Sequence, residues 1–197
     1  MNYQRVALAA TTLGYLDDSD GPTLERYALQ CEGPFVEIGS FVGKSTIWIG
    51  SAAEQVGTVL YAIDPHHGNP EQQPGRECFI PESVDPRTGR VDTLGLFRQT
   101  LRNAGLEHVV IPVAASSTIV GAWWETPVGF VFIDGDHGFG VRDDEKVWHE
   151  HVRPGGYLCF HDSPIPDIGH AIAAAVDHGF ELVERVESLT VLRRPPC

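Results

Sequence analysis

Two aspartates follow apolar segments at positions that suit metal binding. Asp134 closes the segment "GFVFIDG" (129–135), and Asp162 closes "GYLCFHD" (156–162). If both segments are parallel strands, their carboxyl ends lie along one edge of a sheet, so the two carboxylates project into the same crevice. Two carboxylate oxygens, with water or substrate oxygens at the other positions, suit an octahedral hard cation such as Mg²⁺.

A glycine turn in "VEIGSFVGKST" (36–46) offers a second candidate site. It is similar to the phosphate loop G-x-x-x-x-G-K-[ST], because Gly43 is followed by lysine and serine. The first glycine of that motif would stand at position 38, where the sequence has Ile38, and Gly39 comes one residue late. This spacing argues against a phosphate loop, but the free amides of a helix N-terminus still suit other anionic groups, including a carboxylate.

Two acidic side chains near this turn favour a ligand that carries positive charge. Glu37 stands just ahead of the glycines, separated from Gly39 by one residue, where a carboxylate would repel a triphosphate but accept a hydrogen bond from an amino group. Asp64 ends the next apolar segment, a position from which an acidic residue binds ribose hydroxyls. S-adenosylmethionine (SAM) combines ammonium, sulfonium, carboxylate and ribose, so it fits best. A nucleotide is the alternative, because "VFIDGD" (131–136) also resembles the magnesium-binding strand of a nucleotide hydrolase.

Short apolar segments alternate with amphipathic segments, and together they must position these residues. The apolar segments are nearly continuous in apolarity, as strands covered on both faces are. Helices are expected at 92–104, at 140–153 and around 168–176, each followed by glycine or proline. The alternation predicts an α/β fold with a doubly wound, mostly parallel sheet. Strands are expected at 34–39, 58–64, 108–114, 129–135 and 156–162, with two more in 180–194 around a tight turn near Glu187.

Residues 65–91 interrupt this alternation with five prolines and three glycines. A loop of this length inside a compact domain is usually functional or disordered, and we predict a lid over the site, with a solvated excursion as the alternative. We predict a single domain over 1–197 that begins with a helical segment at 1–33. Packing of residues 1–30 against a second subunit would make a homo-oligomer.

The composition limits the kinds of molecule that the protein is expected to bind. The formal net charge is −13, from 14 basic and 27 acidic side chains, which argues against DNA or RNA because their phosphates require a basic surface. The sequence shows neither a secretory leader nor an apolar run of about 18 residues, so we expect no membrane insertion. Scattered cysteines without a C-x-x-C pair favour reduced thiols and a cytoplasmic protein. The cysteines are Cys31, Cys78, Cys159 and Cys197.

Four motifs in order carry a family resemblance: "FVEIGSFVGKSTIWI", "YAIDPH", "VFIDGDHGFGVRDDEKVW" and "VRPGGYLCFHDS". They span residues 35–163 and are similar to the landmarks of class I SAM-dependent methyltransferases. The closest resemblance is to the small-domain group related to macrocin O-methyltransferase and cephalosporin hydroxylase. The resemblance implies a Rossmann-like fold of seven strands, with the last strand antiparallel.

The resemblance also implies roles for matching residues. Ligands in the metal-dependent members occupy the positions of Asp134, His161 and Asp162. His161 stands where a carboxylate or amide is more usual, and imidazole is a softer ligand, which leaves Mg²⁺, Mn²⁺, a transition metal or a metal-free enzyme open. His137 matches a position that can supply the general base. The implied SAM contacts are Glu37, Gly39, Ser40 and Gly43 at the methionine end, Asp64 at the ribose, Ser116 near the adenine, and Asp134.

These roles together predict a SAM-dependent O-methyltransferase that acts on a small-molecule hydroxyl with help from a divalent cation, with Mg²⁺ as the first choice. A non-catalytic SAM- or nucleotide-binding protein and a small nucleotide hydrolase are the alternatives. We expect the charged run 143–146 to be a solvated helix face, and we expect His149 and His151 to be surface residues.

Overall fold

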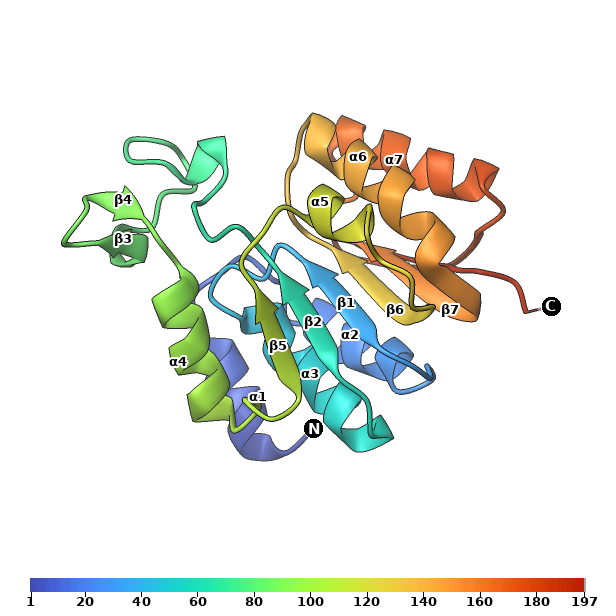
Figure 1. The fold of residues 1–197 in the computed structure, drawn as a ribbon, viewed down its shortest axis with the longest axis horizontal. Coiled ribbons are helices and arrows are strands. Elements are labelled where there is room, and N and C mark those ends of the chain that lie inside the picture. The colour runs from blue at the N-terminus through green and yellow to red at the C-terminus, as the bar shows by residue number, and fades with distance from the viewer. Residues whose placement is uncertain (197) are drawn as a thin grey trace.

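The computed structural model describes residues 1–196, apart from the side chain of Phe139, and is built on a seven-stranded sheet (Figure 1). The spatial order of the strands is β5-β2-β1-β6-β7-β9-β8. Every strand expected from the sequence is present, including the pair in the tail. The strands are β1 (Phe35–Ile38), β2 (Leu60–Ile63), β5 (Val110–Val113), β6 (Val128–Ile133), β7 (Val152–Phe160), β8 (Glu181–Val186) and β9 (Leu189–Arg193).

Strand direction confirms the predicted Rossmann-like topology. β1 pairs in parallel with β2 and β6, β2 with β5, and β6 with β7. The last strand, β9, runs antiparallel to both β7 and β8. From β1 the chain continues to β2 and β5 on one side and then to β6 and β7 on the other, so the strand order switches between β1 and β6. The loops that follow β1, β2 and β6 surround this switch point, where such sheets bind ligands.

Helices cover both faces of the sheet (Figure 1). Successive side chains of β1 point to opposite faces: Phe35 packs in the cluster with α1 to α4, whereas Val36 packs in the cluster with α6 and α7. This two-sided burial explains why the strands read as continuous apolar runs. The helices are α1 (Tyr3–Thr11), α2 (Asp20–Ala28), α3 (Lys44–Val56), α4 (Leu94–Ala104), α5 (Ser117–Gly121), α6 (Phe139–Trp148) and α7 (Pro166–Asp177).

The N-terminal segment is helical, as expected, and packs against its own chain. Arg5 joins three helices, because its Nε donates to the carbonyl oxygen of Ala104 at 2.9 Å and its Nη1 contacts Glu54 at 2.5 Å. The terminal amino group lies 2.5 Å from Glu25 of α2. Both α1 and α2 contact α3, so this segment completes one helical layer of the fold.

The expectation of a helix over 140–153 is wrong at its C-terminal end. α6 ends at Trp148, a short 3₁₀ turn covers His149–His151, and β7 has already begun at Val152. Pro154 therefore lies inside a strand. It is tolerated there because the β6–β7 register shifts between Val128 and Phe130, an irregularity at which a residue without an N–H breaks no ladder bond.

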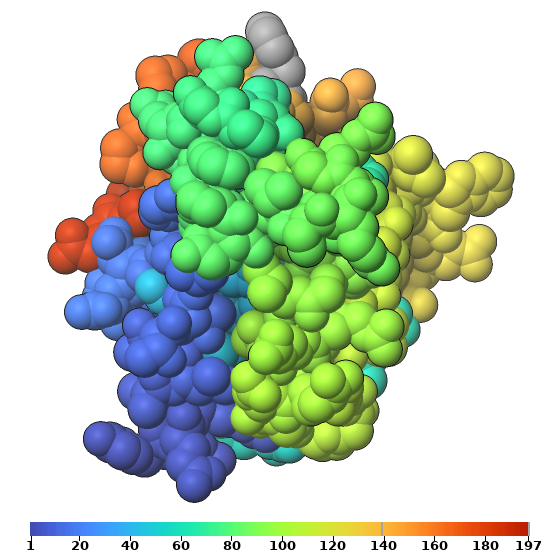
Figure 2. Space-filling view, turned by 90° about the vertical axis from the view of Figure 1, so that its left-hand side faces the viewer, coloured from blue at the N-terminus to red at the C-terminus, as the bar shows by residue number. Residues whose placement is uncertain are grey.

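Residues 65–91 form an ordered excursion next to the sheet edge. The segment contains two 3₁₀ turns and a short hairpin of β3 (Val84–Asp85) and β4 (Arg90–Val91). It lies at the surface above α4 and beside the N-terminal segment (Figure 2). Within the described part of the chain, no helix is long and apolar enough to cross a bilayer. Cys31, Cys78 and Cys159 are free thiols, and Cys197 lies outside the described residues.

Candidate active site

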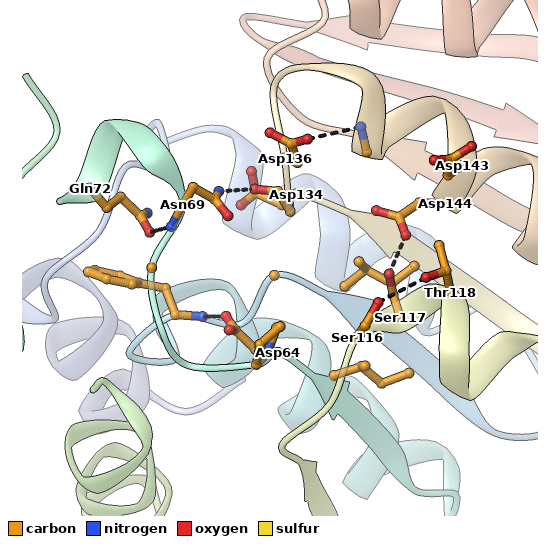
Figure 3. A pocket seen from close by; sticks show the side chains of 18 of the residues that line it. Asp64, Asn69, Gln72, Ser116, Ser117, Thr118, Asp134, Asp136, Asp143 and Asp144 are labelled. Carbon is orange, nitrogen blue, oxygen red and sulfur yellow. Dashed lines mark hydrogen bonds between the residues drawn. The ribbon is translucent and has the colours of Figure 1, made fainter. Parts of the chain in front are cut away.

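A cavity of about 250 Å³ opens at the carboxyl ends of β1, β2, β5 and β6 (Figure 3). Its volume is just below the range of roughly 300–1,000 Å³ that is usual for small-ligand sites. The first turn after β1, the start of the 65–91 segment and the first turns of α5 and α6 supply its walls. Five of the residues that line it are aspartates: Asp64, Asp134, Asp136, Asp143 and Asp144.

The charge of this cavity excludes the phosphate-loop interpretation. Among the described residues that line it, none is lysine or arginine. Lys44, the lysine of the apparent motif, points away and places its Nζ 3.3 Å from the carbonyl oxygen of Gly14. A triphosphate here would meet several carboxylates without a compensating cation, whereas a ligand with positive charge would be attracted.

Asp64 is held rigidly at the end of β2. Its Oδ2 accepts a hydrogen bond from the backbone N–H of Phe41 at 2.8 Å, and its Oδ1 accepts from that of His66 at 2.6 Å. Both donor residues have positive φ, 45° for Phe41 and 60° for His66. Such backbone strain in non-glycine residues often concentrates at functional sites, and here it orients one carboxylate. Asp64 lines the cavity, and its contact with a ribose stays a prediction.

Gly39 lines the cavity, and the space around its Cα explains why this position requires glycine. A Cβ at this position would lie 2.2 Å from the carbonyl oxygen of Asp134 and 2.6 Å from the Cα of Gly135. The backbone also has φ of +85°, which disfavours other residues. The glycine therefore permits close approach between the loops that follow β1 and β6, which brings Asp134 to the turn.

Glu37 does not face the cavity, contrary to the prediction from sequence. It is fully buried, and its two carboxylate oxygens accept hydrogen bonds from Ser45 at 2.6 Å and Thr46 at 2.5 Å. Burial raises the pKa of Glu37 to about 8 despite these two donors. Ser40 and Gly43 are also buried and lie outside the lining, so all three residues support the turn from behind.

A second cluster adjoins the cavity through Asp134. The Nδ1 of His161 lies 3.1 Å from Asp134 Oδ1 and 3.0 Å from Asp162 Oδ2. The predicted convergence of Asp134, His161 and Asp162 is therefore present. Burial lowers the pKa of His161, but Asp134, Asp162 and Asp20 more than offset it and raise the pKa to about 12. Asp162 adopts a positive φ of 51°, which is uncommon for a residue other than glycine.

The geometry of this cluster fits a divalent cation. Adjacent ligands of an octahedral ion, each about 2.1 Å from it, are about 3 Å apart, which matches the separations around Nδ1. Carboxylates suit Mg²⁺ and Mn²⁺, and an imidazole shifts the preference toward Mn²⁺ or a transition metal. The ring nitrogen opposite Nδ1 is also engaged: Nε2 lies 3.2 Å from Asp20 Oδ2 and 2.9 Å from Ser188 Oγ. Nothing in the sequence indicated Asp20 or Ser188.

His137 lies beside the cluster and outside the cavity lining. Its Nε2 is 2.9 Å from Asp162 Oδ2, and its Nδ1 is 3.3 Å from Glu71 Oε1 in the 65–91 segment. The hydrogen bond with Asp162 raises the pKa of His137. With both nitrogens facing carboxylates, His137 connects the segment to the sheet edge and does not present a free base to the cavity.

The expectation that 143–146 forms a solvated face is wrong for two residues. Asp144 and Glu145 are only 5% and 2% exposed. Asp144 lines the cavity, its carboxylate accepts a hydrogen bond from Ser117, and burial raises its pKa to about 6 (Figure 3). Glu145 faces the other way and bonds to His178 at 2.9 Å. Helical spacing from the buried Val141 would have predicted that both residues are buried.

Ser116, which follows β5, lines the cavity, and its place near an adenine stays a prediction. It occupies the N-cap position of α5 without a capping hydrogen bond, and its hydroxyl lies 2.9 Å from that of Thr118. Asp136 lies before α6, and its carboxylate accepts a hydrogen bond from the backbone N–H of Gly140 in the first turn of that helix at 2.9 Å. The hydroxyl groups of Ser116, Ser117 and Thr118 thus lie on the wall that also carries Asp144.

Comparison with known proteins agrees with this architecture. A family model described as a methyltransferase domain matches residues 36–163. The O-methyltransferase NovP superposes with a TM-score of 0.70 at 17% identity, over 90% of this chain and 80% of that one. TomG from Streptomyces achromogenes, an O-methyltransferase of tomaymycin synthesis solved with SAM, gives 0.66 at 17% identity, over 99% and 91%. An O-methyltransferase from Bacillus cereus in complex with SAH gives 0.61 at 14% identity, over 97% and 88%.

Proposed function

The chain belongs to the methyltransferase-domain family, and from this premise we propose that it transfers the methyl group of SAM to a hydroxyl oxygen of a small molecule. The matched region contains the glycine turn, Asp64 and the acidic cluster. The choice of oxygen as the acceptor is supported by the O-methyltransferases that share the fold, and by the carboxylates available to take up a hydroxyl proton.

The observation that carries the proposal is the acidic lining of the cavity. SAM brings a sulfonium and an ammonium group, so it is attracted to a site lined by five aspartates and by no described lysine or arginine. ATP and NAD would place phosphates in the same field and would be repelled. The direction of Lys44 toward the Gly14 carbonyl removes the main argument for a nucleotide hydrolase.

Individual side chains take distinct roles in this proposal. Asp64, fixed by two backbone amides, accepts hydrogen bonds from the ribose hydroxyls. Ser116 and Asp144 line the opposite wall and would face the adenine. Asp134 lines the cavity at the loop after β6 and would take the proton from the acceptor hydroxyl. His137 would hold Asp162 and the 65–91 segment in place, because both of its nitrogens already face carboxylates.

A divalent cation forms part of the proposal. Asp134, His161 and Asp162 would hold it, since their donor atoms lie within 4.8 Å of one another. A bound cation would lower the pKa of the acceptor hydroxyl and orient its oxygen. The histidine makes Mn²⁺ or another transition metal better suited than the Mg²⁺ expected from the aspartates alone.

The 65–91 segment would exclude water from the reaction. Asn69 and Gln72 of this segment line the cavity, and the side-chain amide of Asn69 donates to the carbonyl oxygen of Gly135. Glu71 adds the contact with His137. A segment held at these points could open for exchange and close before transfer, as catalytic lids do.

Ligand-dependent melting tests the proposal directly. At a SAM concentration of 100 times Kd, a ligand that binds only the native state adds about 2.7 kcal/mol, or roughly 5–10 °C for a chain of this size. We expect this shift with SAM and its demethylated product, and none with ATP or NAD. Asp64→Ala should abolish the shift, whereas Asp18→Asn, an exposed change, should keep it. A shift with ATP but not with SAM would refute the proposal.

Turnover separates an enzyme from a non-catalytic SAM-binding protein. A panel of phenols, sugars and polyketide-like hydroxyl compounds would be incubated with methyl-labelled SAM, with Mn²⁺ or with excess chelator. Label transfer in the wild type that is lost in Asp134→Asn, with SAM affinity retained, would support transfer through this site. Full activity in chelator would remove the cation from the proposal.

A further inference from the structure

Three segments that are distant in the sequence meet at the ring of His161. Asp20 begins α2, His161 follows β7, and Ser188 lies in the turn between β8 and β9. The Nε2 of His161 lies 3.2 Å from Asp20 Oδ2 and 2.9 Å from Ser188 Oγ. The Ser188 hydroxyl also donates to Asp20 Oδ2 at 3.0 Å. Asp20 and Ser188 lie outside the family match at 36–163.

The environment of Asp20 is unusual for a carboxylate. The residue is 0% exposed, and its Oδ1 has no hydrogen-bond partner among the described residues. A buried charge is costly unless it is paired, and the ring of His161 lies within pairing distance. An apolar residue would fill the same space at lower cost. The carboxylate is therefore better explained by its effect on His161 than by packing.

The orientation of the ring depends on this contact. His161 is 4% exposed, and its ring lies edge-on to Phe132, with centroids 6.3 Å apart and planes at 78°. When Nε2 donates to Asp20, the opposite nitrogen, Nδ1, points between Asp134 and Asp162. A histidine that binds a metal usually donates its second nitrogen to a carboxylate in this way, which fixes the ring and strengthens the ligand.

We propose that Asp20 is a positioning residue for the cation site: its carboxylate, assisted by Ser188, holds Nε2 of His161 so that Nδ1 binds a divalent cation together with Asp134 and Asp162. The inference rests on the cation in the proposed function and deepens it. It assigns to the N-terminal helical segment and the C-terminal hairpin a direct part in building the site.

Titration with Mn²⁺ alone tests the proposal, with the free ion followed by electron paramagnetic resonance. Asp20→Ala should weaken Mn²⁺ binding about 10- to 100-fold, the usual effect of removing such an outer partner. Asp20→Asn keeps the shape but removes the charge, so we expect a smaller loss of about 3- to 10-fold. Asp18→Asn changes an exposed aspartate of the same segment and should stay within twofold of the wild type.

The affinity for SAM, measured by calorimetry on the same variants, separates positioning from general damage. We expect Asp20→Ala to keep wild-type SAM affinity while Mn²⁺ affinity falls. Equal Mn²⁺ affinity in Asp20→Ala and wild type would overturn the proposal, and so would parallel loss of both ligands. If Asp20→Ala does not fold, Asp20→Asn decides, and an unchanged Mn²⁺ affinity overturns the proposal.

Failure of the inference and failure of the proposed function give different results. A wild-type protein that binds SAM but no Mn²⁺ would overturn the role of Asp20 and leave methyl transfer standing. A protein that binds Mn²⁺ in an Asp20-dependent manner but does not bind SAM would support the positioning role and refute the methyltransferase proposal.

Discussion

The buried carboxyl group of Glu37, which lies behind the glycine turn, should make the stability of the fold depend on pH. Burial raises its pKa from an ordinary value of 4.5 to about 8 in the folded protein, and Asp134 and Asp64 add to the effect. The folded state therefore binds more protons than the unfolded state between these two values. Stability from neutral Glu37 is complete below pH 4.5 and is lost as pH rises toward 8.

The size of this effect follows from the two pKa values. Each pH unit between them changes the free energy of unfolding by about 1.4 kcal/mol. The span from 4.5 to about 8 therefore corresponds to a loss of about 5 kcal/mol. Glu37→Gln keeps the shape of the side chain but does not titrate, so the wild type should lose stability relative to this variant as pH rises.

Urea unfolding between pH 5 and pH 9 measures this difference. The free energy of unfolding of wild type minus that of Glu37→Gln should fall by several kcal/mol across the range and level off above pH 8. Glu125→Gln, an exposed change, should give a constant difference. Because Glu37 lies behind the cavity, SAM affinity should stay within a few-fold of wild type in Glu37→Gln. Parallel pH profiles for wild type and Glu37→Gln would refute the assignment of a buried, neutral carboxyl group.

Three further predictions concern the cavity and the residues around it. Gly39→Ala would place a Cβ 2.2 Å from the carbonyl oxygen of Asp134, so we expect thermal unfolding to show a loss of about 3 kcal/mol or more. Gly57→Ala, where φ is also positive but no atom lies within 4 Å, should lose about 1 kcal/mol, and equal losses would contradict the explanation. Lys44→Ala should leave SAM affinity in calorimetry unchanged, and a tenfold decrease would restore a ligand role for this lysine. Asn69→Ala removes a contact of the 65–91 segment with the loop after β6, so limited proteolysis should cut this segment faster than in wild type, and equal rates would show that the contact does not hold it.

The sequence predicts the parts of the site that depend on strand ends. Asp64, Asp134 and Asp162 each close an apolar run, and the rule that parallel strands end at one edge is enough to bring them together. The direction of Glu37 was not predictable in this way. When both faces of a strand are covered, apolar and polar residues do not alternate along it. The sequence then does not show which side chains point away from the cavity.

Contacts between residues that are far apart in the chain could not be predicted from the sequence either. His161 could be placed at the end of a strand, but its partners Asp20 and Ser188 come from elements that carry no recognisable motif. Asp144 was missed for a different reason, because a run of charged residues was interpreted as a solvent face although the spacing from Val141 indicated burial.

The placement of β9 between β7 and β8 has a consequence for biosynthesis. The Ser188 hydroxyl reaches Asp20 across 168 residues of sequence. A ribosome that adds 5–20 residues per second needs on the order of 10–30 s to make the intervening chain. The surroundings of His161 therefore stay incomplete in the nascent protein until the β8–β9 hairpin has been made.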